Sequence, residues 1–263
     1  MALNTVKKGS LEYLTALNLN VPHAFTTRLG GVSEGAFSSL NIAMHRGDSP
    51  ENVEKNYEIL ADALGFDINN LVLTRQTHSD IVRVVTKSDA HGLDHHSYPE
   101  CDALITSDAG TALVVFTADC TPILLWDSLT GAVGAVHAGW RGTAADIAGK
   151  TVRAMQSEFG CDPQNIRAAI GPNIGACCFE TDADVPEAII ETFGKEAEQF
   201  ICQNGDKYHV DLKGVNSLSL RKSGVESIEI SSDCTMCQPD RFWSHRITGT
   251  NRGSQGAFIV CKK

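Results

Sequence analysis

The chain has 263 residues, with 22 Lys and Arg side chains against 32 Asp and Glu side chains, giving a formal net charge of −10. At roughly 150 residues per domain, this length is enough to build a substantial hydrophobic core. The acidic balance argues against nucleic acid or an anionic membrane as the main partner, because both favour a basic protein surface. It favours a small-molecule substrate instead.

The cysteine content and the start of the chain predict where the protein resides. Nine cysteines, an odd number in a chain of this size, indicate free thiols in a reducing compartment. The first twenty residues contain no apolar stretch of signal-peptide length. The longest uncharged apolar run, residues 109–118, falls well short of the roughly 18 residues of a membrane-spanning helix. We therefore expect a cytoplasmic protein without a membrane segment, either a monomer or a homodimer.

The first predicted element is a helix that begins after Ser49. Ser49 is a typical N-cap and Pro50 a typical first helical residue, and apolar residues then recur at helical spacing up to Leu64, where Gly65 ends the helix. Further along the chain, apolar and β-branched runs predict strands over 81–85, 103–106, 112–116, 122–126 and 132–138. The polar stretch 88–100 between them is expected to be a surface loop with its histidines facing solvent: His91, His95 and His96.

In the second half of the chain, predicted helices alternate with predicted strands. Helical spacing predicts a helix over 143–159 and shorter ones over 185–193 and 212–223, with strands over 166–170, 227–230 and 256–261. Four consecutive strands without a helix between residues 103 and 138 disfavour a strictly alternating βαβ chain and favour an α+β class with mixed sheets. The strand 112–116 is apolar on both sides, which indicates sheet packed against sheet with helices outside. No repeat or linker divides the sequence, so we expect one domain over residues 1–263.

Three residues at predicted strand ends could carry chemistry. Cys120 lies between two apolar strands beside an acid, and His137 closes a strand just before a Gly-Trp-Arg-Gly turn. His78 stands at the start of another strand. Two imidazoles and one thiolate leave one tetrahedral position open, which is typical of catalytic zinc, although the spacing matches no short zinc motif. Cys120 and His137 would equally serve as a nucleophile and its general base.

Two arginines are candidates for binding an anion. Arg28 lies in a glycine-rich turn, residues 27–33, whose backbone N–H groups could surround an anion. Arg141 lies just before a predicted helix, where a guanidinium would act together with the helix N-terminus.

Four further cysteines attract attention by their spacing. Cys234 and Cys237 form a Cys-x-x-Cys motif, but no second pair stands at zinc-finger spacing, so we interpret them as core or surface thiols. Cys177 and Cys178 are adjacent, and adjacent cysteines rarely form an unstrained disulfide. We expect one of these two to be packed and the other to lie near the surface.

Nine short motifs occur in order along the chain: TTRLGGVS at 26–33, SLN at 39–41, GD at 47–48, QTH at 76–78, DALIT at 102–106, ADC at 118–120, HAGWRGT at 137–143, IGP at 170–172 and SHR at 244–246. Over roughly residues 21–260 this series resembles the YfiH-type family. Members of that family are described as laccase-domain polyphenol oxidases, as purine nucleoside phosphorylases with adenosine deaminase activity, and as cytoplasmic peptidoglycan editing factors.

The resemblance implies a fold and a site. The fold would be a four-layer α/β/β/α sandwich, similar to the deamidase domain of cytotoxic necrotising factor. The site would consist of His78, Cys120 and His137, as catalytic residues and as ligands of zinc, with copper as the alternative metal. Two positions depart from the family pattern: Ser79 replaces a glycine, and Tyr57 follows Asn56 where many relatives have arginine. If that arginine holds phosphate, another must replace it here: Arg28, Arg75 or Arg141.

Four functions follow as hypotheses. The leading one is a metal-dependent purine nucleoside enzyme that phosphorolyses adenosine, inosine and methylthioadenosine and deaminates adenosine, with nucleoside and phosphate as its small-molecule partners and Arg28 or Arg141 steering the anion. The second is a copper-dependent polyphenol oxidase, although nine histidines without an H-x-H pair suit multicopper chemistry poorly. The third is a Cys–His amidase or deamidase acting on peptidoglycan precursors. The fourth is a non-enzymatic editing partner.

Overall fold

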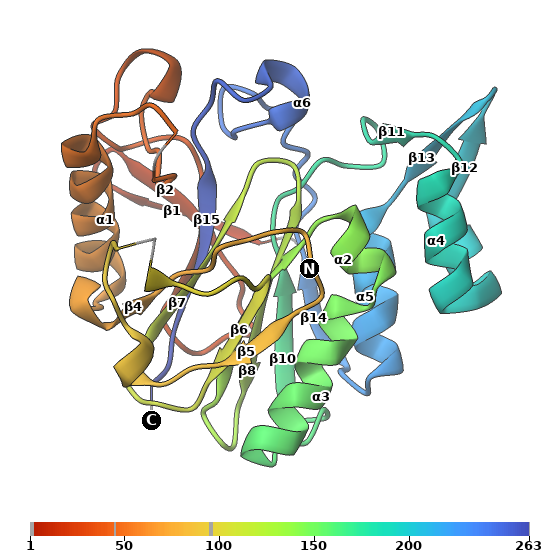
Figure 1. Cartoon of the computed structure of the whole chain (residues 1–263), viewed down its shortest axis with the longest axis horizontal. Coiled ribbons are helices and arrows are strands. Elements are labelled where there is room, and N and C mark those ends of the chain that lie inside the picture. Colours follow the sequence, from red (N-terminus) through yellow and green to blue (C-terminus); the bar gives the residue numbers. More distant parts are fainter. Residues whose placement is uncertain (1–2, 45, 95–96, 263) are drawn as a thin grey trace.

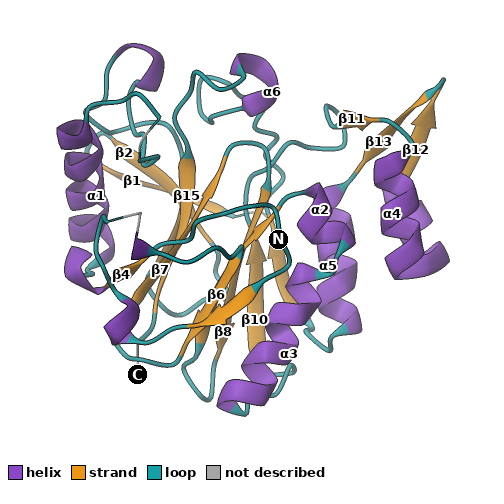
Figure 2. Cartoon of the chain, viewed as in Figure 1, coloured by secondary structure: helices purple, strands orange, loops and turns teal. Residues whose placement is uncertain are grey.

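The structure is a computed structural model that describes residues 3–44, 46–94 and 97–262. Two six-stranded sheets pack face to face, and helices cover their outer faces, so the layers run helix, sheet, sheet, helix (Figure 1). Figure 2 separates the two sheets from the helices that flank them. The predicted α+β class with mixed sheets is confirmed. The likeness to the cytotoxic necrotising factor domain stays a prediction.

The first sheet contains the chain's N-terminal and C-terminal strands. Across the sheet the order is β1 (Asn4–Lys8), β2 (Leu11–Thr15), β3 (His23–Thr26), β15 (Gln255–Val260), β7 (Ala112–Thr117) and β4 (Leu71–Val72). β4 runs parallel to β7, and the other neighbouring pairs are antiparallel. The sequence did not predict β1, β2 and β3, because their runs are short and mix polar with apolar residues.

Helix α1 (Pro50–Leu64) covers the outer face of this sheet. Ser49 caps its first turn by accepting a hydrogen bond from the Asn52 N–H, and Gly65 ends it with φ of 72°, a left-handed conformation that suits glycine. The Tyr57 ring meets Phe258 of β15 edge to face, with 6.1 Å between ring centroids. The bounds of α1, with Ser49 as N-cap and Gly65 as C-cap, are those predicted from the sequence.

The second sheet carries most of the strands that the sequence predicted. Its order is β14 (Ser227–Ile230), β10 (Ile166–Ile170), β8 (Thr121–Asp127), β9 (Val133–Ala138), β6 (Ala103–Thr106) and β5 (Val82–Val84). β10 is parallel to β14 and β5 to β6, whereas the three remaining pairs are antiparallel. Its inner face packs against β7 and β15 of the first sheet. The central strands are buried on both faces, as their apolar sequences indicated.

The helices outside the second sheet differ from the prediction at one point. The expected helix over 143–159 is two helices, α2 (Trp140–Ala144) and α3 (Ile147–Phe159). The break occurs because Asp146 adopts a left-handed conformation, with φ of 60°, and its carboxylate accepts hydrogen bonds from Ser219 and Arg153. α3 packs its apolar side on β9, β6 and β5, and α5 (Leu212–Lys222) lies beside it.

A smaller three-stranded sheet projects from one end of the sandwich (Figure 1). Its order is β11 (Glu180–Thr181), β13 (Lys207–Val210) and β12 (Ile201–Asn204), and it adjoins α4 (Asp184–Phe193) and the 3-10 segment η5 (Gly194–Phe200). It has its own apolar cluster, which includes Ile189, Phe193 and Val215. The sequence predicted α4 and α5 but not these strands.

The remaining described elements are short: η1 (Gly35–Phe37), η2 (Ile68–Asn70), η3 (Lys87–Asp89) and α6 (His245–Thr248). His91 is exposed, as expected, whereas His95 and His96 lie outside the described residues. Within the described ranges, no helix has both the length and the apolar character needed to cross a membrane.

Candidate active site

Strand register brings three distant segments to one end of the second sheet. β8 and β9 pair so that Pro122 lies opposite His137 and Thr121 opposite Ala138, which sets Cys120 at the mouth of the same strand pair. β6 pairs with the other edge of β9, and the His137 N–H donates to the Asp102 carbonyl at 2.7 Å. The loop before β5 carries His78 to this edge.

The three predicted ligands converge. Their ligating atoms, on His78, Cys120 and His137, all lie within 4.8 Å of one another, and we call them the His–Cys–His group. Cys120 Sγ is 3.8 Å from His78 Nε2, and the two imidazole rings meet edge to face with 5.0 Å between centroids. His137 is buried, Cys120 is half-buried and His78 is exposed, so the group opens to solvent on one side.

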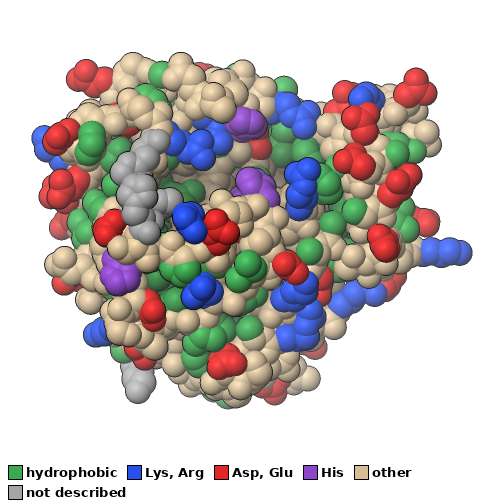
Figure 3. Space-filling model, viewed as in Figure 1, with side chains coloured by type: hydrophobic (Ala, Val, Ile, Leu, Met, Phe, Trp, Pro, Cys, Tyr) green, Lys and Arg blue, Asp and Glu red, His purple; other side chains and the backbone are tan. Residues whose placement is uncertain are grey.

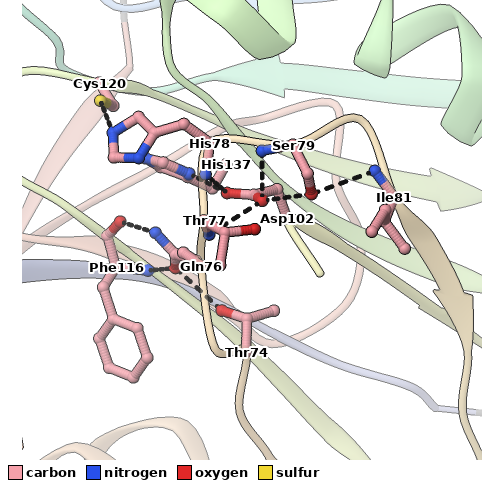
Figure 4. A network of polar contacts seen from close by, with 10 residues as sticks. All are labelled: Thr74, Gln76, Thr77, His78, Ser79, Ile81, Asp102, Phe116, Cys120 and His137. Atoms are coloured by element: carbon pink, nitrogen blue, oxygen red, sulfur yellow. Dashed lines mark hydrogen bonds and ion pairs between the residues drawn. The ribbon is translucent and has the colours of Figure 1, made fainter. Parts of the chain in front are cut away.

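A buried carboxylate fixes the positions of both histidines (Figure 4). Asp102, which is fully buried, accepts hydrogen bonds from the backbone N–H groups of Thr77, His78 and Ser79, at 3.2, 3.1 and 2.7 Å. The Ser79 hydroxyl adds one at 2.6 Å and His137 Nδ1 one at 2.7 Å. Because Nδ1 is engaged, His137 presents Nε2 to Cys120. Burial raises the pKa of Asp102, but the hydrogen bonds and the charge of His137 outweigh it and lower the pKa to about 2.

Cys120 and His137 shift each other's protonation. Burial raises the pKa of the Cys120 thiol, but the charge and hydrogen bond of His137, with a smaller contribution from His78, lower it to about 6. Burial lowers the pKa of His137, but the thiolate of Cys120 and the carboxylate of Asp102 raise it. The group therefore favours a thiolate at neutral pH, which is the protonation state of a metal ligand or a nucleophile.

The backbone around the His–Cys–His group is unusual at three residues, two with a left-handed conformation and one glycine in close contact with a ring. His78 has φ of 60° and Asp119 has φ of 86°, both in the left-handed region that non-glycine residues rarely adopt. Gly139 faces the His78 ring so closely that an added Cβ would lie 2.7 Å from Cδ2 and 3.4 Å from Cys120 Sγ. A side chain at position 139 would therefore displace His78.

Asp119 ties the Cys120 turn to the C-terminal part of the chain. Its carboxylate accepts hydrogen bonds from the Thr235 hydroxyl at 2.6 Å, the Ser244 hydroxyl at 3.1 Å and the Arg246 N–H at 2.7 Å. These bonds hold the start of α6 over the site. They bring Arg246 and its neighbour His245 to the wall of the cavity described next.

A cavity of about 350 Å³ lies over the His–Cys–His group. Figure 3 shows this hollow with histidine and basic side chains around it. Gln76 joins this cavity to a neighbouring one of about 150 Å³, since it lines both together with Arg46, Phe116 and Ser254. The large cavity contains three arginines and an apolar wall: Arg46, Arg246, Arg252, Phe116, Ile174 and Phe179.

Arg252 is the most unusual of these side chains. It is 8% exposed, and its Nε has no hydrogen-bond partner among the described residues, while one terminal nitrogen donates to the Gly253 carbonyl and the Ser254 hydroxyl. Burial and the nearby charge of Arg46 lower the pKa of Arg252 to about 10. A buried guanidinium with an unused donor, beside a second guanidinium, fits a bound anion.

Comparison with known proteins identifies the family. The chain matches the sequence model of the family described as "Multi-copper polyphenol oxidoreductase laccase" over residues 22–262. The chain belongs to this YfiH-type family. It is 38% identical over 240 residues to the purine nucleoside phosphorylase YlmD of Geobacillus stearothermophilus, covering 89% of this chain and 88% of that protein. It is 39% identical to a purine nucleoside phosphorylase of Deinococcus radiodurans, over 95% of this chain and 92% of that protein.

Solved structures of relatives agree with the fold. The crystal structure of YlmD from Geobacillus stearothermophilus superposes with a TM-score of 0.92 at 34% identity, covering 98% of this chain and 99% of that chain. The structure titled as a Bacillus licheniformis hypothetical protein YfiH gives the same TM-score at 33% identity, over 99% of each chain. The YfiH-type family inferred from the motifs is thereby confirmed.

Neither arginine predicted to bind the anion lines the cavity of this family member. Arg28 donates to the carbonyls of Ser38 and Pro239 and stacks on the Trp243 ring, 3.9 Å from its centroid, so it supports the glycine-rich turn. Arg141 is exposed and lies over the Trp140 ring in the five-residue helix α2. The assignment of these two arginines to an anion stays a prediction, and in the structure three other arginines line the cavity.

The two departures from the family pattern also have structural explanations. Tyr57 is fully buried and its hydroxyl donates to the Ile42 carbonyl at 3.1 Å, so position 57 belongs to the core under α1 and not to the cavity. Ser79 supplies the extra hydroxyl hydrogen bond to Asp102, which a glycine would lack. Arg75, the third substitute considered, pairs with Glu100 at 3.2 Å and lines the smaller cavity.

Sequence reasoning missed several residues that surround the site. Asp102, Asp119, His245 and Arg246 all lie within motifs of the series given above, but the residues around them offered no reason to assign them a role. Arg252 lies outside every motif and only its burial reveals it. Motif membership was therefore a usable signal for four of these five residues.

Proposed function

We propose that this chain is a metal-dependent purine nucleoside phosphorylase. In that reaction a phosphate oxygen attacks C1′ of the ribose, the bond from C1′ to N9 breaks, and the purine leaves with the bonding electrons and takes up a proton. The observation that carries the proposal is the cavity, which joins an open His–Cys–His group to a buried guanidinium with an unused donor. The relatives named purine nucleoside phosphorylases support the same reading.

The donor set fits zinc. His78 and His137 offer imidazole nitrogens and Cys120 a thiolate, three ligands that leave one tetrahedral position open to the cavity. When bound, the ion supplies a Lewis acid beside the substrate. Asp102 orients the His137 ring through Nδ1, as outer carboxylates do in metal sites. Copper would compete for the same ligands, because a thiolate with two imidazoles binds it more tightly than zinc.

The arginines account for phosphate. Arg46, Arg246 and Arg252 line the cavity, and the unused Nε of buried Arg252 gains a partner when an anion enters. Three cationic side chains also explain how a protein with a net charge of −10 attracts phosphate locally. This arrangement replaces Arg28 and Arg141 in the proposed role.

The other lining residues suit a nucleoside. Phe116, Ile174 and Phe179 give the purine an apolar wall. His245 Nδ1 donates to the Gly249 carbonyl at 2.9 Å, so the other ring nitrogen, Nε2, is the one available to a substrate. We assign His245 as the group that protonates the leaving purine. Deamination of adenosine at the same site is a secondary reaction, in which water adds at C6 and ammonia leaves.

A second candidate rests on the same atoms. The His137 imidazole lies between the Cys120 thiol and the Asp102 carboxylate. This order of thiol, imidazole and carboxylate activates cysteine nucleophiles. In a metal-free amidase or deamidase the Cys120 thiolate would attack the amide carbonyl carbon, the C–N bond would break as the amine or ammonia leaves with a proton from His137, and water would then hydrolyse the thioester. The two candidates differ in what zinc does, since it is required by the first and blocks the nucleophile of the second.

One experiment tests both candidates. Zinc-free and zinc-loaded protein are incubated with adenosine or inosine, with and without phosphate, and the bases and ribose 1-phosphate are separated by chromatography. We expect free base and ribose 1-phosphate only with zinc and phosphate together. Replacing Arg252 by Gln should raise the KM for phosphate by about 10-fold or more, because one charge-assisted hydrogen bond is lost.

Arg141→Gln is the matched control, because it removes an exposed guanidinium outside the cavity and should leave the phosphate KM unchanged. Base release that does not depend on phosphate, or zinc-loaded protein without nucleoside turnover, contradicts the phosphorylase proposal. Activity on amide substrates that zinc suppresses would establish the second candidate.

A further inference from the structure

Four cysteines outside the active site meet in space although the sequence separates them into two pairs. β10 and β14 are parallel neighbours in the second sheet, so the segments that follow them leave the same edge side by side. The Thr235 N–H donates to the Asn173 carbonyl at 2.9 Å and links these two segments. The first then carries Cys177 and Cys178, and the second carries Cys234 and Cys237.

The four sulfur atoms lie within 4.8 Å of one another, and we call them the four-cysteine cluster. Cys237 Sγ is 3.6 Å from Cys177 Sγ and 3.4 Å from Cys178 Sγ. Zinc–sulfur bonds of about 2.3 Å in a tetrahedron would separate the sulfurs by about 3.8 Å. The cluster therefore already has close to the size of a tetrahedral tetrathiolate site.

The surroundings of the cluster suit thiolates. The Gly175 N–H donates to Cys234 Sγ at 3.2 Å, and a Cβ at position 175 would lie 3.2 Å from Cys177 Sγ. Lys213 is 8% exposed, and its Nζ donates to the carbonyl of Asp233, the residue before Cys234. A buried cation beside the cluster offsets part of the negative charge that four thiolates and one divalent cation leave.

The arrangement brings together the two cysteine pairs that the sequence analysis considered separately. Cys234 and Cys237 lack a second Cys-x-x-Cys motif, but the adjacent pair Cys177 and Cys178 completes the set across the sheet. A single disulfide would account for two of the four thiols and would leave the convergence of the others unexplained. Cys234 is buried and Cys178 half-buried, whereas Cys177 and Cys237 are exposed, so an ion can enter from solvent.

We propose that Cys177, Cys178, Cys234 and Cys237 bind one zinc ion in a closed structural site. Four protein ligands leave no position for a substrate, which distinguishes this site from the open His–Cys–His group. The ion clamps the segments after β10 and β14. The inference concerns the metal content of the chain and does not depend on the proposed phosphorolysis.

The proposed zinc ion would hold part of the active-site wall in place. Ile174 and Phe179 flank the first cysteine pair, and both line the large cavity. On the second segment, Thr235 donates to Asp119, the residue before Cys120. The proposed ion therefore fixes the cavity wall from outside, as a positioning element.

The test measures zinc in a protein that lacks the first site. The Cys120→Ala variant is purified with excess zinc, desalted and analysed for metal by mass spectrometry. Circular dichroism verifies that it is folded. We expect one zinc per chain. Adding Cys237→Ser, at an exposed position, should reduce the zinc to none and lower the Tm, and Cys177→Ser, also exposed, should do the same.

Cys202→Ser is the matched control, since it removes an exposed thiol of β12 outside the cluster and should leave the zinc unchanged. Substitution of cobalt for zinc in the Cys120→Ala chain should give the visible absorption bands of a tetrahedral tetrathiolate ion, which Cys237→Ser abolishes. Zinc-free Cys120→Ala protein, zinc that survives both cluster substitutions, or a disulfide between cluster cysteines in the freshly purified chain would each overturn the proposal.

Discussion

Asp102 organises the His–Cys–His group through a single carboxylate. One oxygen accepts from His137 Nδ1 and the His78 N–H, and the other accepts from Ser79 and Thr77. The carboxylate thus fixes one ring directly and the other through the backbone of its loop. Because Asp102 is fully buried, water cannot replace these bonds when one is lost.

Replacing Asp102 by Asn should loosen metal binding. The amide offers one acceptor oxygen, and its NH₂ group faces N–H donors that the carboxylate had satisfied. We expect zinc affinity at the His–Cys–His group to fall by about 10- to 100-fold, as measured by competition with a zinc-binding dye in a Cys237→Ser background. Ser79→Ala is the control, because it removes the hydroxyl and keeps the carboxylate. Unchanged affinity in Asp102→Asn would show that the carboxylate does not hold the ligands.

At the scale of elements, strand pairing fixes the site. β8 and β9 pair antiparallel and bring Cys120 next to His137, and β6 on the other edge of β9 brings in Asp102. A shift of one residue in either register would turn one of these side chains to the opposite face of the sheet. The turn after β9 must then remain clear of side chains, because the His78 ring packs against Gly139.

Replacing Gly139 by Ala should displace His78. Its φ of −67° is accessible to alanine, so the backbone can stay as it is, but the added Cβ would lie 2.7 Å from His78 Cδ2. We expect zinc affinity at the His–Cys–His group to fall about 10-fold or more with little change in Tm. Gly134→Ala in β9 is the matched control, since its Cβ would make contacts of 3.4 Å or longer. Equal zinc binding by the two variants would contradict this account.

At the scale of the whole molecule, a sandwich of two sheets brings its C-terminal segment across the site. β15 lies in the middle of the first sheet, and α6 just before it carries Arg246 to the cavity, with Arg252 in the connection between them. The same packing buries Asp102 completely. The ionisation of its carboxylate therefore contributes to the free energy of unfolding.

The stability of the metal-free protein should therefore depend on Asp102 in acid. The pKa of Asp102 is about 2 in the folded chain, below the ordinary value of 3.8 for an aspartate, so the unfolded state binds more protons than the folded state between these pH values. The stabilisation is present above pH 3.8 and is lost as the pH falls through about 2. We expect the difference in unfolding free energy between wild type and Asp102→Asn to shrink by about 2 kcal/mol between pH 5 and pH 2.

Urea unfolding of zinc-free protein at several pH values measures this difference. Tyr57→Phe serves as the control, because it removes a buried hydroxyl hydrogen bond worth about 1 kcal/mol that does not titrate in acid. Its difference from wild type should stay constant over the same range. A constant difference for Asp102→Asn as well would mean that the carboxylate is not stabilised in its ionised form.

The sequence by itself determined the elements whose signals are local. The N-cap, the first-turn proline and the terminal glycine define α1, and apolar runs define β6, β10 and β14, because capping and burial act on neighbouring residues. The α+β class followed from four consecutive strands. His78, Cys120 and His137 were identifiable as candidates because unusual residues at strand ends stand out locally, and the motif series assigned the family.

Only the tertiary structure decided which residues meet. Contacts made across sheet registers and between the chain's ends are absent from local patterns, so the support from Asp102, the arginines around the cavity and the four-cysteine cluster could not be derived from spacing. For the same reason the partners of Arg28 and Arg141, the Ser38 carbonyl and the Trp140 ring, became visible only in the folded chain. The sequence specifies the chemistry of each side chain. Its partners depend on packing that brings residues more than a hundred positions apart into contact.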